Sequence, residues 1–179
     1  GYQVHGEAMF AEPRFIVSTA LIAESGGLTD LRDQALAKLA NPQLEAVQTT
    51  PLYRRLAAVL FGDRAPTEQL TTVHGMAEEL DSAFFERMIM YRMTDAELSS
   101  RPVLKIRTER ALYKRSFAEA LTLMEGIEPD GDADQLAFWR GWARFATGDH
   151  EESRRLLGQL IAQHPDSPWS AVAKKVQSG

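Results

Sequence analysis

The chain has 179 residues, of which 44% are hydrophobic and 25% are charged, and its formal net charge is −5. This composition suffices for one ordinary domain or a short array of repeats with a sizeable core. The acidic balance argues against a general nucleic-acid binder. The absence of cysteine excludes disulfides, thiol nucleophiles and zinc–thiolate sites. No run approaches the roughly 18 apolar residues needed to cross a bilayer, so no direct membrane span is expected.

The first half of the chain reads as a series of short helices. After an extended lead-in over residues 1–13, Phe15, Thr19 and Ile22 lie at helical spacing, and Gly26-Gly27 ends that helix. Thr29 is predicted to cap the following helix, and Thr94 or Asp95 a short one further on. The helices predicted in this half cover residues 14–24, 29–39, 51–61, 66–80, 84–93 and 96–98.

The second half continues the pattern with longer amphipathic helices. Helices are expected over 103–114 and 117–125, followed by an acidic loop over 128–134. From Gln135 to Lys175, two helical patterns are joined by Gly148-Asp149 and stopped by His164-Pro165, and a third short helix follows. No segment shows the alternation of a half-buried strand. The chain is therefore predicted to be all-α, with about nine to eleven helices.

Two windows in the second half match at a spacing of 33 residues. A weaker similarity relates Leu52–Asp63 to Phe138–Asp149, with Gly62 aligned to Gly148. Matches at a fixed spacing indicate an internal repeat of helical hairpins. The 33-residue pairs are Phe117/His150, Ala120/Ser153, Met124/Leu157 and Ile127/Leu160.

Here the chain resembles the tetratricopeptide repeat, a helix–turn–helix unit of about 34 residues. The residues that carry the resemblance are Gly141, Gly148-Asp149, Ser153, Leu157 and Pro165. Glycine at the turn can adopt the left-handed conformation, and small residues let two helices approach closely. The match is partial, because the large apolar residues that the family has in its first helix are replaced by Ala137, Arg140 and Arg144.

The resemblance implies an α-solenoid of antiparallel hairpins. It covers residues 101–175, so residues 101–179 are expected to form two repeats and a capping helix, with residues 14–100 forming irregular hairpins packed on them. The passage from His164 to Lys175 is similar to one in tetratricopeptide proteins of bacterial envelopes. That similarity implies a periplasmic or envelope-associated protein, and a cytoplasmic location is the alternative.

In the resembled family, the first helix of each repeat lines a groove that holds peptides. The corresponding positions here are Lys105, Glu109 and Tyr113 in one repeat, and Phe138, Trp142 and Phe145 in the next. These six residues are the predicted partner-binding residues. The competing interpretation of the aromatic residues is that they are core between helices.

Other candidate sites are weaker. Asp130, Asp132 and Asp134 occupy the first, third and fifth places of a calcium loop, but Gln135 and Gly141 break the pattern. The six cations within residues 101–115 read as a solvated helix face or a basic groove. Glu24 before Ser25 resembles the catalytic passage of lytic transglycosylases, or is simply a helix end. No cofactor or metal is expected.

The sequence thus favours a non-enzymatic scaffold that binds a protein or peptide partner, with no nucleic acid involved. Two alternatives remain open: the helical arm of a cell-wall lytic enzyme, and a structural homo-oligomer that uses the Met- and Phe-rich segment 84–93 as its interface.

Overall fold

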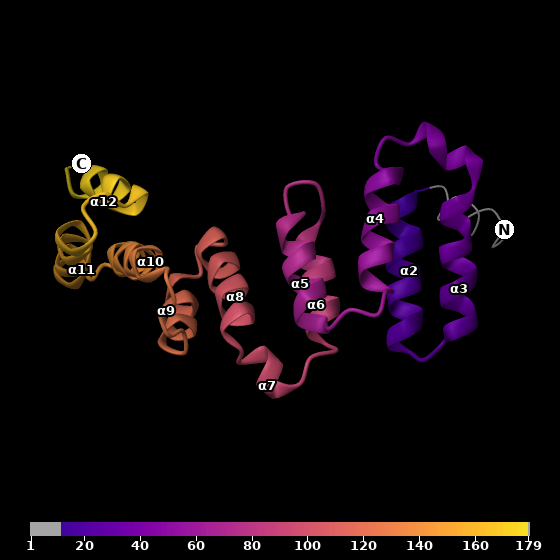
Figure 1. Ribbon diagram of the computed structural model, residues 1–179, viewed down its shortest axis with the longest axis horizontal. Helices are drawn as coiled ribbons and strands as arrows, with labels where there is room; N and C mark the ends of the chain where they lie inside the picture. The colour runs from indigo at the N-terminus through magenta and orange to yellow at the C-terminus, as the bar shows by residue number, and fades with distance from the viewer. Residues whose placement is uncertain (1–11, 179) are drawn as a thin grey trace. The chain divides into compact units, whose positions relative to one another are not determined.

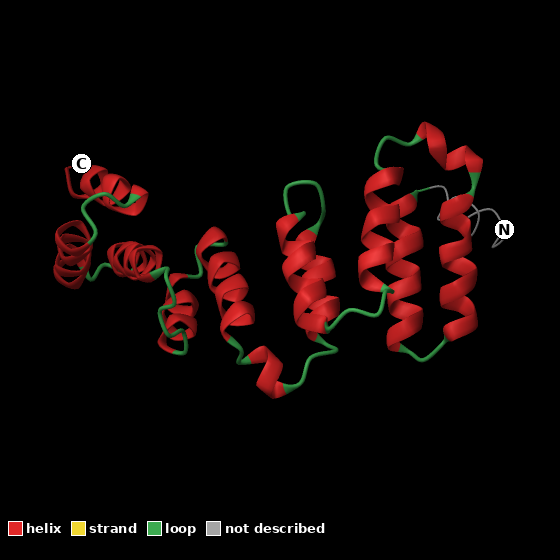
Figure 2. Ribbon diagram, in the orientation of Figure 1, coloured by secondary structure: helices red, strands yellow, loops and turns green. Residues whose placement is uncertain are grey.

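The computed structural model describes residues 12–178, and most of the predicted lead-in, residues 1–11, lies outside that range. Within it, the regular elements are helical: eleven α-helices and two short 3-10 helices, and no strand (Figures 1 and 2). The all-α prediction is confirmed. The chain divides into two compact units between Met93 and Thr94. Residues 94–100, which the sequence grouped with the first half, therefore belong to the second unit.

The first unit begins with a helix one residue earlier than predicted, because Pro13 occupies its first turn, where a missing N–H has no consequence. The predicted cap at Thr29 is wrong: Leu28 precedes the helix and makes no side-chain cap hydrogen bond. The elements of this unit are α2 (Pro13–Ser25), α3 (Thr29–Ala37), η1 (Lys38–Ala40), η2 (Pro42–Ala46), α4 (Thr50–Leu60), α5 (Pro66–Gly75) and α6 (Ser82–Met90).

The core of the first unit is built around α2, which packs against α3 and α4. α5 then packs against α4 and α6. Tyr53 on α4 and Phe85 on α6 place their ring centroids 6.3 Å apart, and both side chains are buried. Phe85 lies in the segment that the sequence considered as an oligomer interface, and its full burial assigns this residue to the core.

The second unit is a chain of six helices in which each packs against the next (Figure 1). A capping box formed by Thr94 and Glu97 starts the first of them, which confirms the cap predicted at Thr94. The helices are α7 (Asp95–Leu98), α8 (Arg101–Tyr113), α9 (Phe117–Glu125), α10 (Ala133–Ala146), α11 (His150–Gln163) and α12 (Pro168–Ser178). α10 also contacts α12 directly.

Three helix pairs, α2/α3, α8/α9 and α10/α11, are joined by the same turn. In each, the second residue after the first helix has a positive φ: 71° at Gly27, 61° at Arg115 and 88° at Gly148. The next N–H then donates to a carbonyl five residues back, at 2.8–2.9 Å. This is the Schellman closure, which satisfies the free carbonyls of a helix end.

Gly62 does not belong to this set. It has no positive φ, and the α4–α5 connection lacks the closing hydrogen bond of the other three turns. The similarity between Leu52–Asp63 and Phe138–Asp149 therefore does not reflect equivalent turns. The counterpart of Gly148 in the first unit is Gly27.

Three of the four 33-residue pairs of the second unit are equivalent in burial, whereas Phe117 is half-buried and its counterpart His150 is exposed. Ala120 and Ser153 are both buried, as are Met124 and Leu157, and Ile127 and Leu160. Gly141 lies against α11 so closely that a Cβ there would be 2.5 Å from Leu157 Cδ2. The absence of a side chain at Gly141 is what permits this approach, as the sequence predicted.

Candidate partner-binding face

The three predicted residues on α8 differ in exposure and in their contacts. Tyr113 is 81% exposed, the largest fraction among the exposed apolar side chains of the described chain, and Glu109 is also exposed. Lys105 is half-buried and is held by hydrogen bonds within the unit. It therefore offers less to a partner than Tyr113 does.

The three predicted residues on α10 follow a gradient of burial. Phe138 is buried, Trp142 is half-buried, and Phe145 is 47% exposed. Phe138 and Trp142 are stacked, with centroids 6.5 Å apart and planes 17° from parallel. Phe145 instead contacts the His150 ring at 4.9 Å. Phe138 is therefore core, as the competing interpretation of these aromatics expected, whereas Trp142 and Phe145 reach the surface.

Two aromatic residues that the sequence analysis did not assign to the site extend the stack. Phe117, at the start of α9, meets Trp142 edge-on at 5.5 Å, and Trp169, at the start of α12, stacks on Phe138 at 5.2 Å. The four rings of Phe117, Trp142, Phe138 and Trp169 form an aromatic row across three helices. In the sequence, the one sign of these residues is that Phe117 and Trp169 each begin a helix after a turn. Their position beside α10 follows only from the folding of the chain.

A charge cluster fixes the start of α10 to α8. The Asp132 carboxylate accepts from Arg101 Nη2 and from Lys105 Nζ, both at 2.5 Å. Lys105 Nζ also donates to Gln135 Oε1 at 3.1 Å and lies 6.0 Å from the Trp139 ring centroid. Partial burial by itself would raise the pKa of Asp132, but the hydrogen bonds from Lys105, from the Asp130 N–H and from Arg101 outweigh it, and the pKa is lowered.

The same acidic loop also fixes α12. Ser167 Oγ donates to Asp134 Oδ2 at 2.5 Å, and this hydrogen bond is the main reason that the pKa of Asp134 is lowered. Asp132 and Asp134 are thus engaged by side chains of the same unit. In residues 12–178 no group of three or more acidic or histidine side chains is placed to hold a metal ion. The acidic loop is a connector of helices.

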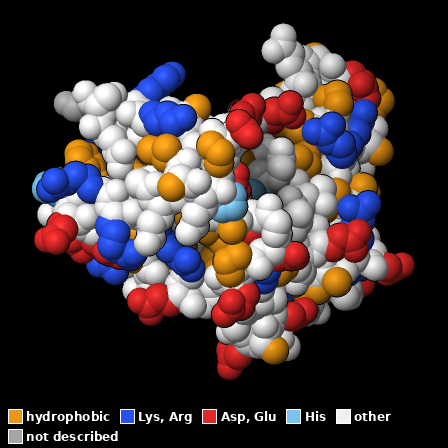
Figure 3. Space-filling view, turned by 60° about the vertical axis from the view of Figure 1, so that its left-hand side comes forward, with side chains coloured by type: hydrophobic (Ala, Val, Ile, Leu, Met, Phe, Trp, Pro, Cys, Tyr) orange, Lys and Arg blue, Asp and Glu red, His pale blue; other side chains and the backbone are white. Residues whose placement is uncertain are grey.

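Two of the cations of α8, Arg101 and Lys105, are engaged by the loop that precedes α10. Arg101 donates to Glu128 O as well as to Asp132, and Lys105 is held as described above. Charges of both signs are interspersed with apolar side chains on the surface that Figure 3 shows. Two of the six cations in residues 101–115 therefore stabilise the helix arrangement.

Glu24 sits in the last turn of α2, directly before the glycine-closed turn. One carboxylate oxygen lies 3.5 Å from Arg32 Nη1, and the other is buried without a hydrogen-bond partner. This location fits the helix-end interpretation of the sequence. The ion pair between Glu24 and Arg32 joins α2 to α3.

The exposed large apolar side chains of the second unit lie on alternate helices. In the described part of this unit they are Tyr113, Phe145 and Val172, the last 42% exposed. One lies on each of α8, α10 and α12. We give the name first-helix face to the side chains that α8, α10 and α12 expose, namely Tyr113, Trp142, Phe145, Trp169 and Val172. Exposed aromatic and aliphatic groups gathered on one set of helices suit the binding of apolar side chains.

No helix within residues 12–178 combines the length and the apolarity needed to cross a membrane. No family model, no curated protein and no solved structure matches this chain, so the candidate site rests on the geometry described above.

Proposed function

We propose that the second unit is a protein-binding module of tetratricopeptide type, whose first-helix face holds an apolar segment of a partner protein. The observation that carries this proposal is the location of Tyr113, Phe145 and Val172 on α8, α10 and α12, one on each. The intervening helices α9 and α11 have no exposed large apolar side chain. A face formed by alternate helices is the surface that helical-repeat proteins use for binding.

The connections between these helices support the proposal. Asp132 joins the start of α10 to α8, and Asp134 joins it to Ser167 at the start of α12. The helix starts are therefore held in register, and the side chains that follow along each helix present a defined surface. A surface ordered before binding loses less conformational entropy when a partner binds.

The half-buried rings supply the second part of the argument. Trp142 is held between Phe138 and Phe117, so its remaining exposed surface keeps a fixed orientation. Rigid aromatic side chains that are partly buried before binding are typical of the residues that dominate interface energies. Trp142, Tyr113 and Phe145 are therefore the proposed anchors.

A peptide-display selection on the purified protein tests this function. Selected peptides should bind the Tyr113→Ala/Phe145→Ala double variant about tenfold more weakly or worse, since each exposed anchor contributes on the order of 1 kcal/mol. Fluorescence anisotropy measures the affinities, and circular dichroism checks that helical content is unchanged. Tyr91→Ala is the matched control, because Tyr91 is an exposed tyrosine of the first unit.

Equal affinity of the selected peptides for the wild type and the double variant would remove the first-helix face from consideration. Failure of the selection to enrich any peptide would count against a peptide-binding module altogether. The resemblance of residues 164–175 to envelope proteins supports an envelope-associated location for this module. Fractionation of cells that produce the native protein checks that location, and recovery only in the cytoplasm would contradict it.

A further inference from the structure

Charged side chains in the second unit are divided between its helices in the same way as the exposed apolar ones. The helices α8, α10 and α12 together carry eight cationic side chains and two acidic ones, Glu109 and Asp134. The helices α9 and α11 carry two cationic side chains and four acidic ones. Positive charge and exposed apolar side chains therefore occur on the same set of helices.

Four of the eight cations have partners inside the unit. Arg101, Lys105 and Arg144 form ion pairs with aspartates, and Arg140 donates to a backbone carbonyl of α9. These contacts hold the helices and their turns in place. The positive charge that is available to a partner must therefore come from other side chains.

Two lysines beside the exposed apolar side chains have no such partner. Lys114 directly follows Tyr113 at the end of α8, and Lys175 lies three residues after Val172 on α12. Both lysines are exposed and make no ion pair within residues 12–178. Because residues three apart lie on the same side of a helix, Lys175 is beside Val172. Residues 168–178 of α12 include no acidic side chain that could compensate its charge.

The exposed acidic residues of the loop before α10 lie at the other end of α8. Glu128 and Asp130 belong to that loop, and Arg101, the first residue of α8, donates to Glu128 O at 2.9 Å. The loop is therefore held at the start of α8, whereas Tyr113 and Lys114 lie at its end. A helix of this length extends over about 20 Å, so these carboxylates do not neutralise the charge of Lys114.

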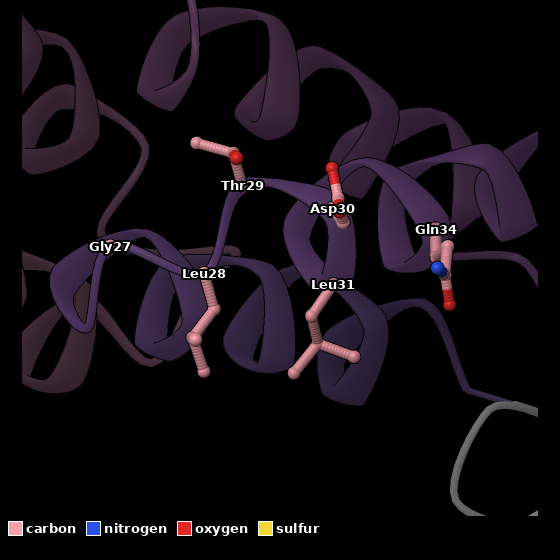
Figure 4. Close-up of a pocket in the computed structure, with 6 residues that line it drawn as sticks. All are labelled: Gly27, Leu28, Thr29, Asp30, Leu31 and Gln34. Atoms are coloured by element: carbon pink, nitrogen blue, oxygen red, sulfur yellow. The ribbon is translucent and has the colours of Figure 1, made fainter.

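The shallow pocket at the α2–α3 turn of the first unit lacks this combination of groups. Leu28 and Leu31 line the pocket and point to the same side, away from Asp30 (Figure 4). The neighbouring cation, Arg32, is paired with two carboxylates. Exposed leucines therefore occur here without an uncompensated positive charge, and Leu31 can serve as a control site.

We propose that the partner segment held by the first-helix face is acidic, with carboxylates beside its apolar anchors. This inference rests on the proposed function and specifies the chemistry of the partner. Apolar side chains of the segment contact Trp142 and Phe145 on α10, and its aspartates or glutamates meet Lys114 on α8 and Lys175 on α12. Charge complementarity of this kind speeds association and disfavours basic segments.

The test is the composition of the peptides that a displayed random library yields against the whole protein. Enriched peptides should carry aspartate or glutamate next to their apolar positions. Lys175→Glu should weaken their binding about threefold to tenfold, because it places a like charge beside Val172. Lys174→Glu changes the net charge equally but lies two residues after Val172, on the other side of α12, and should leave the affinity unchanged. Leu31→Ala should also leave it unchanged.

Salt supplies a second measurement on the same variants, and melting curves confirm that each is folded. The difference in affinity between the wild type and Lys175→Glu should shrink between about 0.1 M and about 1 M salt, because the Debye length falls from about 10 Å to about 3 Å. A difference that does not depend on salt would contradict a role of charge.

The outcomes separate this inference from the proposed function. Enrichment of neutral or basic peptides that still require Tyr113 and Phe145 would overturn the acidic partner and leave the proposed function standing, whereas no enrichment would overturn both. Equal weakening by Lys174→Glu and Lys175→Glu would show that net charge alone decides binding, and would overturn the contact at Lys175. Binding of mixed-sequence RNA that Lys175→Glu weakens, without enrichment of acidic peptides, would assign the lysines to nucleic acid instead.

Discussion

Gly141 illustrates at the scale of one residue how this chain sets the distance between two helices. Its missing side chain leaves room for Leu157, whose Cγ would lie 2.7 Å from a Cβ at position 141. Gly158, the residue after Leu157, sits in the interior of α11, and a Cβ added there would meet no heavy atom within 4 Å beyond its chain neighbours and the nearby backbone of its own helix. The same substitution at these two glycines therefore has opposite consequences.

Gly141→Ala is expected to lower the free energy of unfolding by about 1–3 kcal/mol, because the added methyl group forces α10 and α11 apart or distorts Leu157. Gly158→Ala is expected to raise it by about 0.5–1 kcal/mol, because alanine is the better helix former. Urea denaturation followed by circular dichroism measures both. A stabilising Gly141→Ala would show that the close approach of α10 to α11 is absent.

Asp132 is the residue whose ionisation matters most for the arrangement of α8 and α10. Its folded-state pKa is lowered by the partners named above, so its contribution to stability is present above the unfolded-state pKa of about 3.9 and is lost as the pH falls through the folded-state value. Asp132→Asn should cost about 1–2 kcal/mol at neutral pH. The difference between wild type and variant should shrink below about pH 4.

Chemical denaturation of the wild type and of Asp132→Asn measures how the difference in unfolding free energy depends on pH. The measurements run from about pH 2 to about pH 7, which includes the range in which carboxylates titrate. Asp130→Asn is the matched control, because the Asp130 side chain is exposed and makes no ion pair within residues 12–178. A pH-independent difference for Asp132→Asn would contradict a charge-based role for Asp132.

At the scale of elements, the turn that recurs three times shows which sequence signals were sufficient to predict where a helix ends. Gly27 and Gly148 mark two of the turns, since glycine is the usual residue at a positive φ. The third turn places Arg115 at φ 61°, a conformation that costs a non-glycine residue about 1–2 kcal/mol. The residues around Arg115 do not predict this turn. It is predicted only by the 33-residue repeat, which aligns Arg115 with Gly148.

Exchanging the residue types at these positions tests the equivalence of the turns. Gly148→Ala should lower the free energy of unfolding by about 1 kcal/mol, because alanine is strained at this φ. Arg115→Gly should raise it by about 0.5 kcal/mol, after allowance for the added flexibility of the unfolded chain. Thermal melts monitored by circular dichroism give both values. Destabilisation by Arg115→Gly would mean that the Arg115 side chain makes a contact that outweighs the relieved strain.

At the scale of the whole molecule, the second unit contains its own core. The buried cluster that includes Leu104, Leu136, Trp139 and Leu157 is drawn from residues 104–173, all within that unit. A fragment of residues 94–178 is therefore expected to fold alone, as many domains of this size do. The measurement is a thermal melt with a dispersed NMR spectrum of the fragment. A fragment without a cooperative transition would contradict an autonomous core.

The sequence by itself determined the helices and where most of them stop, because apolar periodicity, prolines and turn glycines act locally. It also determined the equivalence of Ala120, Met124 and Ile127 with residues 33 positions later, since burial at a repeated position requires similar side chains. The resemblance to the tetratricopeptide repeat led us to expect Glu109, Tyr113 and Phe145 on an outer face, with core as the alternative for Phe145, and all three side chains are exposed.

The tertiary structure alone decided which side chains remain available to contact a partner. Lys105 was predicted to line the groove, but its ammonium group donates hydrogen bonds to Asp132, in a later loop, and to Gln135, in a later helix. Phe117 and Trp169 joined the aromatic row only because α9 and α12 pack beside α10. These outcomes depend on contacts between residues that are far apart in the chain, and helical periodicity carries no information about which distant side chain will meet a given face.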